Sequence, residues 1–217
     1  VETRDDSGGA ITIDVGTGSL DTADQLINSR DGDDSNNDSG TITLIADTID
    51  LGTTADKITT TGAVILKPDT TNTAINISTG SAENAGTGFD LSTNEVEAVN
   101  NTTSKLTIGK VSGSSAGAVA LSADVYDFAS LEVLGNGITV GGAITTSNDT
   151  DIDLDGDTIT VSAGVTTGTG SITLEADSGI TISGVALTTT GAAIDLGSAA
   201  ITLDTGTVTL TTGSGSA

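Results

Sequence analysis

The chain has 217 residues, 30 of them acidic and 6 basic, which gives a net charge of −24, and it contains neither His nor Cys. The lack of both residue types excludes a His/Cys zinc site, a cysteine nucleophile, a Ser/His/Asp triad and a disulfide framework. All six basic residues lie in the first 110 positions, so the second half cannot hold a phosphate backbone by countercharge and we expect no nucleic-acid partner. No run of eighteen apolar residues occurs, so we also expect no membrane span.

The first predicted element is the strand Ile11-Thr-Ile-Asp-Val15, which is apolar at alternate positions. The acidic stretch near 28–39 is predicted to form an excursion loop between strands. Gly40-Thr-Ile-Thr-Leu44 then restores the strand pattern, and nearly the same phrase returns far downstream as Gly170-Ser-Ile-Thr-Leu174. Two distant copies of one phrase indicate a repeat that spans most of the chain.

A second interruption of the strand pattern is predicted near 82–105. Within it, Ser92 lies three residues before Glu95, which is the spacing of a capping box, and Val96 and Val99 are one helical turn apart. We therefore expect a short helix that begins after Ser92 and packs against the strands.

The last third of the chain carries three apolar columns that recur about every 21 residues. Each member of the first two columns reads apolar, polar, apolar, so the aliphatic pair should face inward and the middle residue outward. The first column starts at Ile138, Ile159, Ile180 and Ile201, the second at Ile152, Ile172 and Ile194, and the third at Ile144, Val165, Leu187 and Leu210. Outward positions of the first column are Thr139, Thr160, Thr181 and Thr202.

A unit of three short strands cannot bury its own apolar face, whereas stacked units bury it against each other. The sequence therefore predicts an all-β fold, a right-handed parallel β-helix (solenoid) of about 21 residues per coil with three short strands per coil. We expect about ten coils, all in one domain over residues 1–217, which would be a segment of a longer chain.

Several phrases resemble the large repetitive bacterial exoproteins of filamentous-haemagglutinin type, which are secreted by two-partner or autotransporter routes. The resemblance is carried by GTITLIADTIDLGTT (40–54), GAVILKPDTTNTAINIST (62–79), FDLSTNEVEAV (89–99), KLTIGKVSGSSAGAVALSA (105–123) and GSITLEADSGITISG (170–184). It implies a β-helical rod, an extracellular or bacterial cell-surface location and a fibrous or adhesive role.

Four acidic residues form the candidate metal site: Asp151, Asp153, Asp155 and Asp157. With Gly156 they match the first half of a calcium loop, in which alternate carboxylates converge on a hard cation. The twelfth position is Ser162 instead of Glu, and Ile152 and Leu154 belong to an inward column. The alternative is a strand with outward Asp side chains, and calcium is the one cofactor that the sequence suggests.

The function predicted from these features is that of a non-catalytic structural rod in a bacterial extracellular fibre, sheath or adhesin. Its acidic, Thr-rich surface would contact the cell surface or glycans, and copies would associate end to end into a fibre because each end offers a strand layer. The alternative is a glycan-acting or glycan-binding β-helix module, similar to a polysaccharide lyase or hydrolase. Such modules normally use aromatic platforms, and Phe89, Tyr126 and Phe128 are the only aromatic residues, so we expect no catalytic residues.

Overall fold

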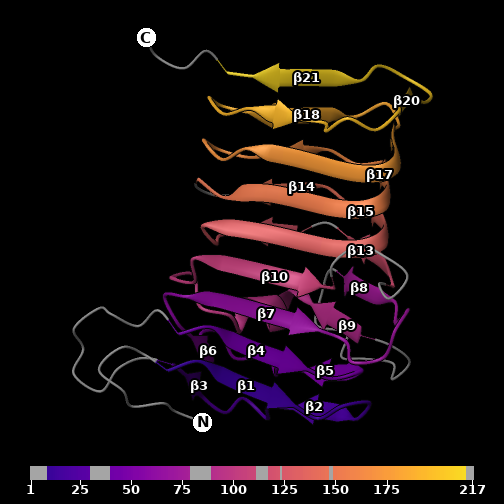
Figure 1. Cartoon of the computed structure of the whole chain (residues 1–217). Coiled ribbons are helices and arrows are strands. Elements are labelled where there is room, and N and C mark those ends of the chain that lie inside the picture. Colours follow the sequence, from indigo (N-terminus) through magenta and orange to yellow (C-terminus); the bar gives the residue numbers. More distant parts are fainter. Residues whose placement is uncertain are drawn as a thin grey trace.

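The computed structural model describes residues 9–29, 40–78, 89–110, 117–122, 124–146 and 149–213, and the statements below concern these residues. The fold is all-β, with 53% of residues in strands and 3% in helix, and its parallel strands form a curled sheet. All pairings between named strands in the described ranges are parallel. Figure 1 shows the strands stacked in layers, with the first layer at the bottom and the last at the top.

One side of the stack is formed by eight strands in succession. They are β1 (Ile11–Asp14), β4 (Ile42–Ile45), β7 (Ala63–Lys67), β10 (Lys105–Gly109), the first halves of β13 (Ser130–Val140), β15 (Asp151–Val161) and β17 (Ile172–Ile182), and β19 (Ile194–Asp195). These eight strands mark eight layers, whereas the sequence predicts about ten. The number is lower because the early layers contain more than 21 residues each. Ile11 pairs with Ile42, and Val64 pairs with Leu106, so these two steps take 31 and 42 residues.

The other two sides contain shorter strands. The second side holds β2 (Ser19–Asp21), β5 (Thr48–Asp50), β9 (Phe89–Ser92), β8 (Ile75–Ser78), β11 (Ala118–Leu121), the second halves of β13, β15 and β17, and β20 (Ile201–Leu203). The third holds β3 (Ile27–Asn28), β6 (Ile58–Thr59), β12 (Asp124–Tyr126), β14 (Ile144–Thr146), β16 (Val165–Thr166), β18 (Ala186–Thr189) and β21 (Thr209–Thr212).

The three predicted columns are confirmed as strand register. Ile138 pairs with Ile159, Ile159 with Ile180 and Ile180 with Ile201. The second column pairs Ile152 with Ile172 and Ile172 with Ile194, and the third pairs Ile144, Val165, Leu187 and Leu210 in that order. The column residues named here that lie below the last layer are at most 1% exposed, and they belong to one continuous hydrophobic core. The predicted outward Thr residues of the first column are exposed or half-buried.

The interruption predicted at 82–105 differs from an excursion loop in its described part. β9 pairs with β8 in parallel, with Ile75 opposite Phe89, and it lies against β5 on its other side. A strand that comes later in the chain is thus inserted below an earlier one, because the buried Phe89 and Leu91 continue the apolar core. The predicted excursion near 28–39 lies outside the described residues from position 30 to 39.

The predicted helix is confirmed as α1 (Thr93–Glu97), and Ser92 is its N-cap with a complete capping box. The carboxylate of Glu95 accepts hydrogen bonds from the Ser92 backbone N–H and hydroxyl, both at 2.8 Å, and from the Leu51 N–H at 3.2 Å. Glu95 is 4% exposed, so this one carboxylate joins the inserted segment to the layer that contains β5.

Candidate functional site

The four acidic residues of the candidate calcium site all lie on β15. They occupy alternate positions, outside the buried Ile152 and Leu154, so they share the outer face of one strand. Side chains two residues apart on a strand are separated by about 6.6 Å, whereas calcium needs oxygens at about 2.4 Å from one point. The described residues contain no group of three or more acidic side chains close enough to hold a metal ion. The structure does not bring the four together, and calcium binding stays a prediction.

Two of these carboxylates bind hydroxyl groups of the next layer instead. Asp151 accepts hydrogen bonds from the backbone N–H and the hydroxyl of Ser171, both at 2.7 Å, and Asp157 accepts one from the Ser178 hydroxyl at 2.5 Å. Thr169 makes the same kind of contact with Asp149. These contacts bridge neighbouring layers, since the partners are 20 or 21 residues apart.

The same pairing between layers recurs towards the N-terminus. Asn76 donates to Asp90 at 2.6 Å, directly across the β8–β9 pair. Asp24 accepts the backbone N–H groups of Thr54 and Thr53, both at 2.9 Å, and these bonds lower the pKa of the Asp24 carboxyl below its usual value. Many surface carboxylates are therefore part of the bonding between layers, and each opposes a neutral donor.

Like-charged residues do oppose each other at three places in the strand register. Asp21 lies opposite Asp50, Glu132 opposite Asp153, and Asp155 opposite Glu175. Where Glu132 lies opposite Asp153, the charge of Glu132 is partly balanced. Lys105 forms an ion pair with Glu132 at 2.6 Å, and the Thr107 hydroxyl donates a hydrogen bond to the same carboxylate at 2.8 Å.

Asp153 lies half-buried on this face, opposite Glu132. Burial raises the pKa of Asp153, and the negative charges of Glu132 and Glu175 raise it further. One oxygen of Asp153 is buried and has no hydrogen-bond partner. This carboxyl accordingly holds a proton to higher pH than an ordinary Asp.

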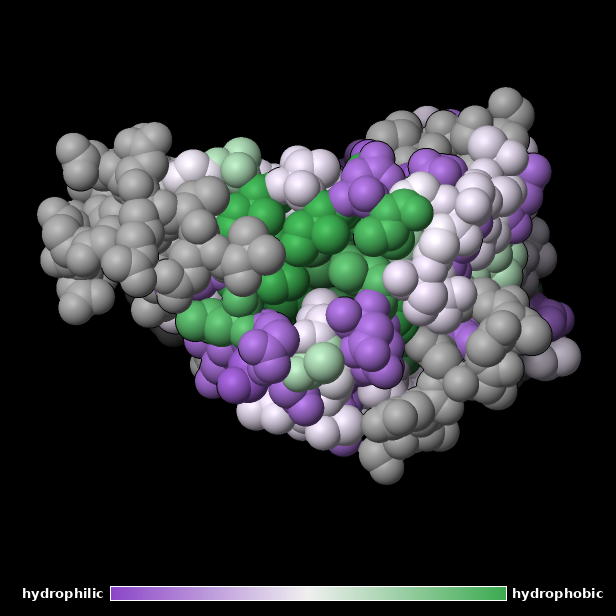
Figure 2. Space-filling view, turned by 90° about the horizontal axis from the view of Figure 1, so that it is seen from below, coloured by the Kyte–Doolittle hydropathy of each residue, from purple (hydrophilic) through white to green (hydrophobic). Residues whose placement is uncertain are grey.

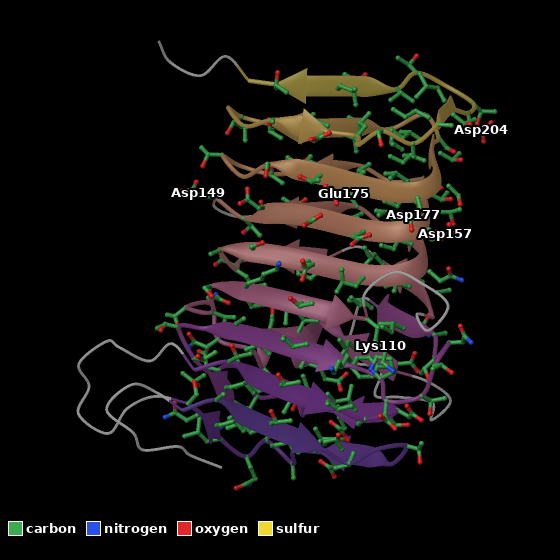
Figure 3. The ribbon with its side chains drawn as sticks, viewed as in Figure 1. Lys110, Asp149, Asp157, Glu175, Asp177 and Asp204 are labelled. Atoms are coloured by element: carbon green, nitrogen blue, oxygen red, sulfur yellow. The ribbon has the colours of Figure 1, made fainter. Side chains whose placement is uncertain are left out.

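A shallow acidic groove of about 400 Å³ lies beside this cluster. Its lining consists of Asp155, Glu175, Ala176, Asp177, Gly197 and Ser198. Figure 3 shows Glu175 and Asp177 at the β17 level with Asp157 one layer below. The lining includes no aromatic and no basic side chain, so it offers three carboxylates and the Ser198 hydroxyl for chemistry.

The sequence predicts outward Thr side chains, but a set of buried ones was missed. These buried Thr residues follow strands of the third side, where the chain turns into the next layer. Thr60, Thr167 and Thr189 are at most 1% exposed. Their hydroxyls donate to backbone carbonyls of Gly40, Gly170 and Ala192 at 2.6, 2.5 and 2.6 Å. The signal was present as the repeated phrase apolar-Thr-Thr-Thr-Gly at 58–62 and 187–191, whose third residue is this buried Thr.

The chain matches no protein-family model, no curated protein and no solved structure. Its described residues include no helix with the length and apolar character needed to cross a membrane.

Proposed function

We propose that this chain is a non-catalytic structural rod, a right-handed parallel β-helix that forms part of a bacterial extracellular fibre, sheath or adhesin. The observation that carries the proposal is the register of the three apolar columns, which stay in step from β13 to the last layer. Parallel connections are right-handed by default, and identical layers add length without adding a new core. Eight layers at about 4.8 Å each would span about 40 Å.

The surface supports a spacer more than a catalyst. All three aromatic residues of the chain, Phe89, Tyr126 and Phe128, are at most 4% exposed, so none offers a stacking platform to a sugar ring. Several described carboxylates outside the acidic groove, among them Asp24, Asp90 and Asp151, bind N–H, amide or hydroxyl groups of neighbouring layers. The extracellular location is part of the proposal and is supported by the resemblance to repetitive bacterial exoproteins.

A glycan-acting or glycan-binding module is the alternative function. The groove that contains Asp155, Glu175 and Asp177 is the observation that favours it, because glycosidases use pairs of carboxylates. The alternative gives the groove a role in glycan binding or cleavage, and the rod proposal gives it none. A substitution of a groove carboxylate, Glu175→Gln, therefore separates the two proposals.

The experiment combines location with ligand binding. Antibodies raised against the chain should label extracellular fibres or the cell surface in electron micrographs of the native material, and label confined to the cytoplasm would contradict the proposal. In parallel, the purified chain should release no sugar from polysaccharides, and any glycan binding on an array should be the same in a Glu175→Gln variant, because the rod proposal gives the groove no role. Glycan binding that is lost in the variant would favour the alternative.

A further inference from the structure

The sides of the stack contain unequal numbers of strands. In the described residues the first side holds eight strands and the second side nine, because β9 is inserted between β5 and β8. Figure 1 shows β5, β9 and β8 one above another. One extra strand lengthens the second side by about 4.8 Å, so the layers above and below β9 must diverge towards that side.

Strand pairing passes through this level without a break on the first side. There β4 pairs with β7 over four residue pairs, from Ile42–Val64 to Ile45–Lys67, and β7 pairs with β10. On the second side β2 and β5 form a separate two-stranded sheet, and the large sheet resumes at β9. Among the described strands no pairing joins β5 to β9, although the two lie against each other. The second side therefore has a joint at the place where the first side has a continuous sheet.

The layers below this joint have a core of their own. We call β1–β6 the lower body and the later strands, with β9 among them, the upper body. Ile11, Ile42 and Ile49 of the lower body are at most 4% exposed. Figure 2, which looks along the stack from the end of the lower body, shows hydrophobic residues bordered by hydrophilic ones. The lower body can thus move as a unit.

The segment of residues 89–100 connects the two bodies away from the first side. β9, at its start, pairs with β8 of the upper body, whereas Val99, near its end, forms a parallel bridge with Ile58 of the lower body. The Asn100 N–H also donates to the Ile58 carbonyl at 2.9 Å. The helix α1 lies between these two attachments, so it crosses the joint.

We propose that the joint between β5 and β9 is a hinge, that it opens about the β4–β7 ladder, and that the Glu95 side chain holds it closed. One carboxylate oxygen of Glu95 accepts the Leu51 N–H of the lower body at 3.2 Å. The other oxygen accepts the Ser92 N–H and hydroxyl of the upper body, both at 2.8 Å. The two oxygens of one side chain are thus divided between the two bodies. The inference goes beyond the proposed rod function and depends on the fold alone.

Charge and burial act in opposite directions at this hinge. Burial, and then the negative charge of Asp50 in the lower body, raise the pKa of Glu95, so the two carboxylates repel each other across the joint. Phe89 and Leu91 of β9 are fully buried, and opening would expose this apolar surface to water. The closed form is therefore the main one, and the open form is a minor population.

Spin-label distances test the direction of the motion, since the chain has no Cys of its own. Ser19→Cys and Ala120→Cys place labels on exposed residues of the second side, below and above β9, and Thr12→Cys and Glu175→Cys do so on the first side. Glu95→Ala should lengthen and broaden the distance distribution of the second-side pair and leave the first-side pair unchanged. An equal change in both pairs, or no change in either, would overturn the hinge.

Thiol labelling tests how often the joint opens. Leu91→Cys places a thiol at a fully buried position of β9, and Leu154→Cys is the matched control, equally buried in β15. A soluble maleimide should label Leu91→Cys at least about tenfold faster than Leu154→Cys. Circular dichroism should show that both variants retain their strands. Equal labelling rates at the two positions would contradict the proposal.

Glu95→Gln separates the role of the carboxylate from that of the side chain's volume. Gln has the same shape but one acceptor oxygen, so either Leu51 or Ser92 loses its partner. Added to Leu91→Cys, it should raise the labelling rate severalfold, and added to Leu154→Cys it should leave the rate unchanged. An equal rise at both positions would indicate general destabilisation, and no rise at Leu91→Cys would show that Glu95 does not hold the joint; either result would overturn the proposed hinge.

Discussion

Replacing Ile180 by Asp is the most direct test of the column register. Ile180 is 1% exposed and is paired with Ile159 on one side and Ile201 on the other. The change removes a buried aliphatic side chain, which costs about 2–5 kcal/mol, and places a carboxyl with no partner in the core. We expect a total loss of at least about 4 kcal/mol at neutral pH, a large part of the stability of a typical domain.

Two substitutions in the same columns provide matched controls. Ile201→Asp makes the same chemical change one layer higher, where the side chain is 44% exposed, and should cost about 1 kcal/mol or less. Thr181→Ser removes one methyl group from the outward neighbour of Ile180 and should change stability by less than about 1 kcal/mol.

The measurement is urea-induced unfolding followed by circular dichroism. Since a layered stack can unfold in parts, hydrogen exchange should also show which layers open, and we expect β17 to β21 to lose protection in Ile180→Asp. The cost should shrink at acidic pH, because a buried carboxyl has a raised pKa and becomes neutral there. Equal damage from Ile180→Asp and Thr181→Ser would refute the inward and outward assignment.

Three further predictions concern Glu95, the corner glycines and calcium. Glu95→Ala should cost about 1–3 kcal/mol, because the N–H groups of Leu51 and Ser92 lose their acceptor. Burial raises the pKa of Glu95, so the stability that this group contributes is present below its ordinary pKa and is lost as pH rises through the raised value. The free energy of unfolding of the wild type, relative to that of Glu95→Gln, should therefore fall as pH rises from about 4, as measured by urea unfolding. Gly170→Ala should lower the melting temperature, because its added Cβ would lie 2.0 Å from the Thr150 carbonyl oxygen, whereas Gly191→Ala meets nothing within 4 Å and should be neutral or stabilising. If calcium binds at Asp151, Asp153 and Asp155, a chelator should lower the melting temperature of the wild type and leave the triple Asn variant unchanged; no shift with chelator in the wild type would leave only the strand interpretation.

The sequence predicted those features that depend on local alternation and on the repeat length. Ile159 and Thr160 face opposite sides because strand side chains alternate, and the 21-residue interval places Ile159 on Ile180 without further information. The helix after Ser92 was equally local, since three residues fix a capping box. Neither inference required knowledge of a distant contact.

The order of β8 and β9 could not be predicted in this way. Both segments are apolar at alternate positions, so either could continue the core. Their order depends on which of them packs on β5, and Glu95 makes part of that choice by accepting the Leu51 N–H, 44 residues away. A contact over this sequence distance leaves no periodic signal.

The candidate site was ambiguous for a different reason. Alternate Asp residues are required in a calcium loop, but they are equally compatible with the outer face of a strand. Burial favours the strand, because Ile152 and Leu154 are fully buried and hold β15 extended, while calcium binding itself stays a prediction. An extended strand spreads the carboxylates along its length instead of around one point.

The abundance of Thr and Ser beside Asp acquires a physical meaning in the stack. Neighbouring layers are about 4.8 Å apart, so columns made only of Asp would repel strongly at neutral pH. Where a hydroxyl alternates with a carboxylate, as at Asp151 and Ser171 or Asp157 and Ser178, the same spacing produces a hydrogen bond between layers. The acidic surface is therefore compatible with axial stacking of its own layers, while it still opposes lateral contact between molecules. Layers paired in this way can be added in one direction, which is the property that the proposed fibre requires.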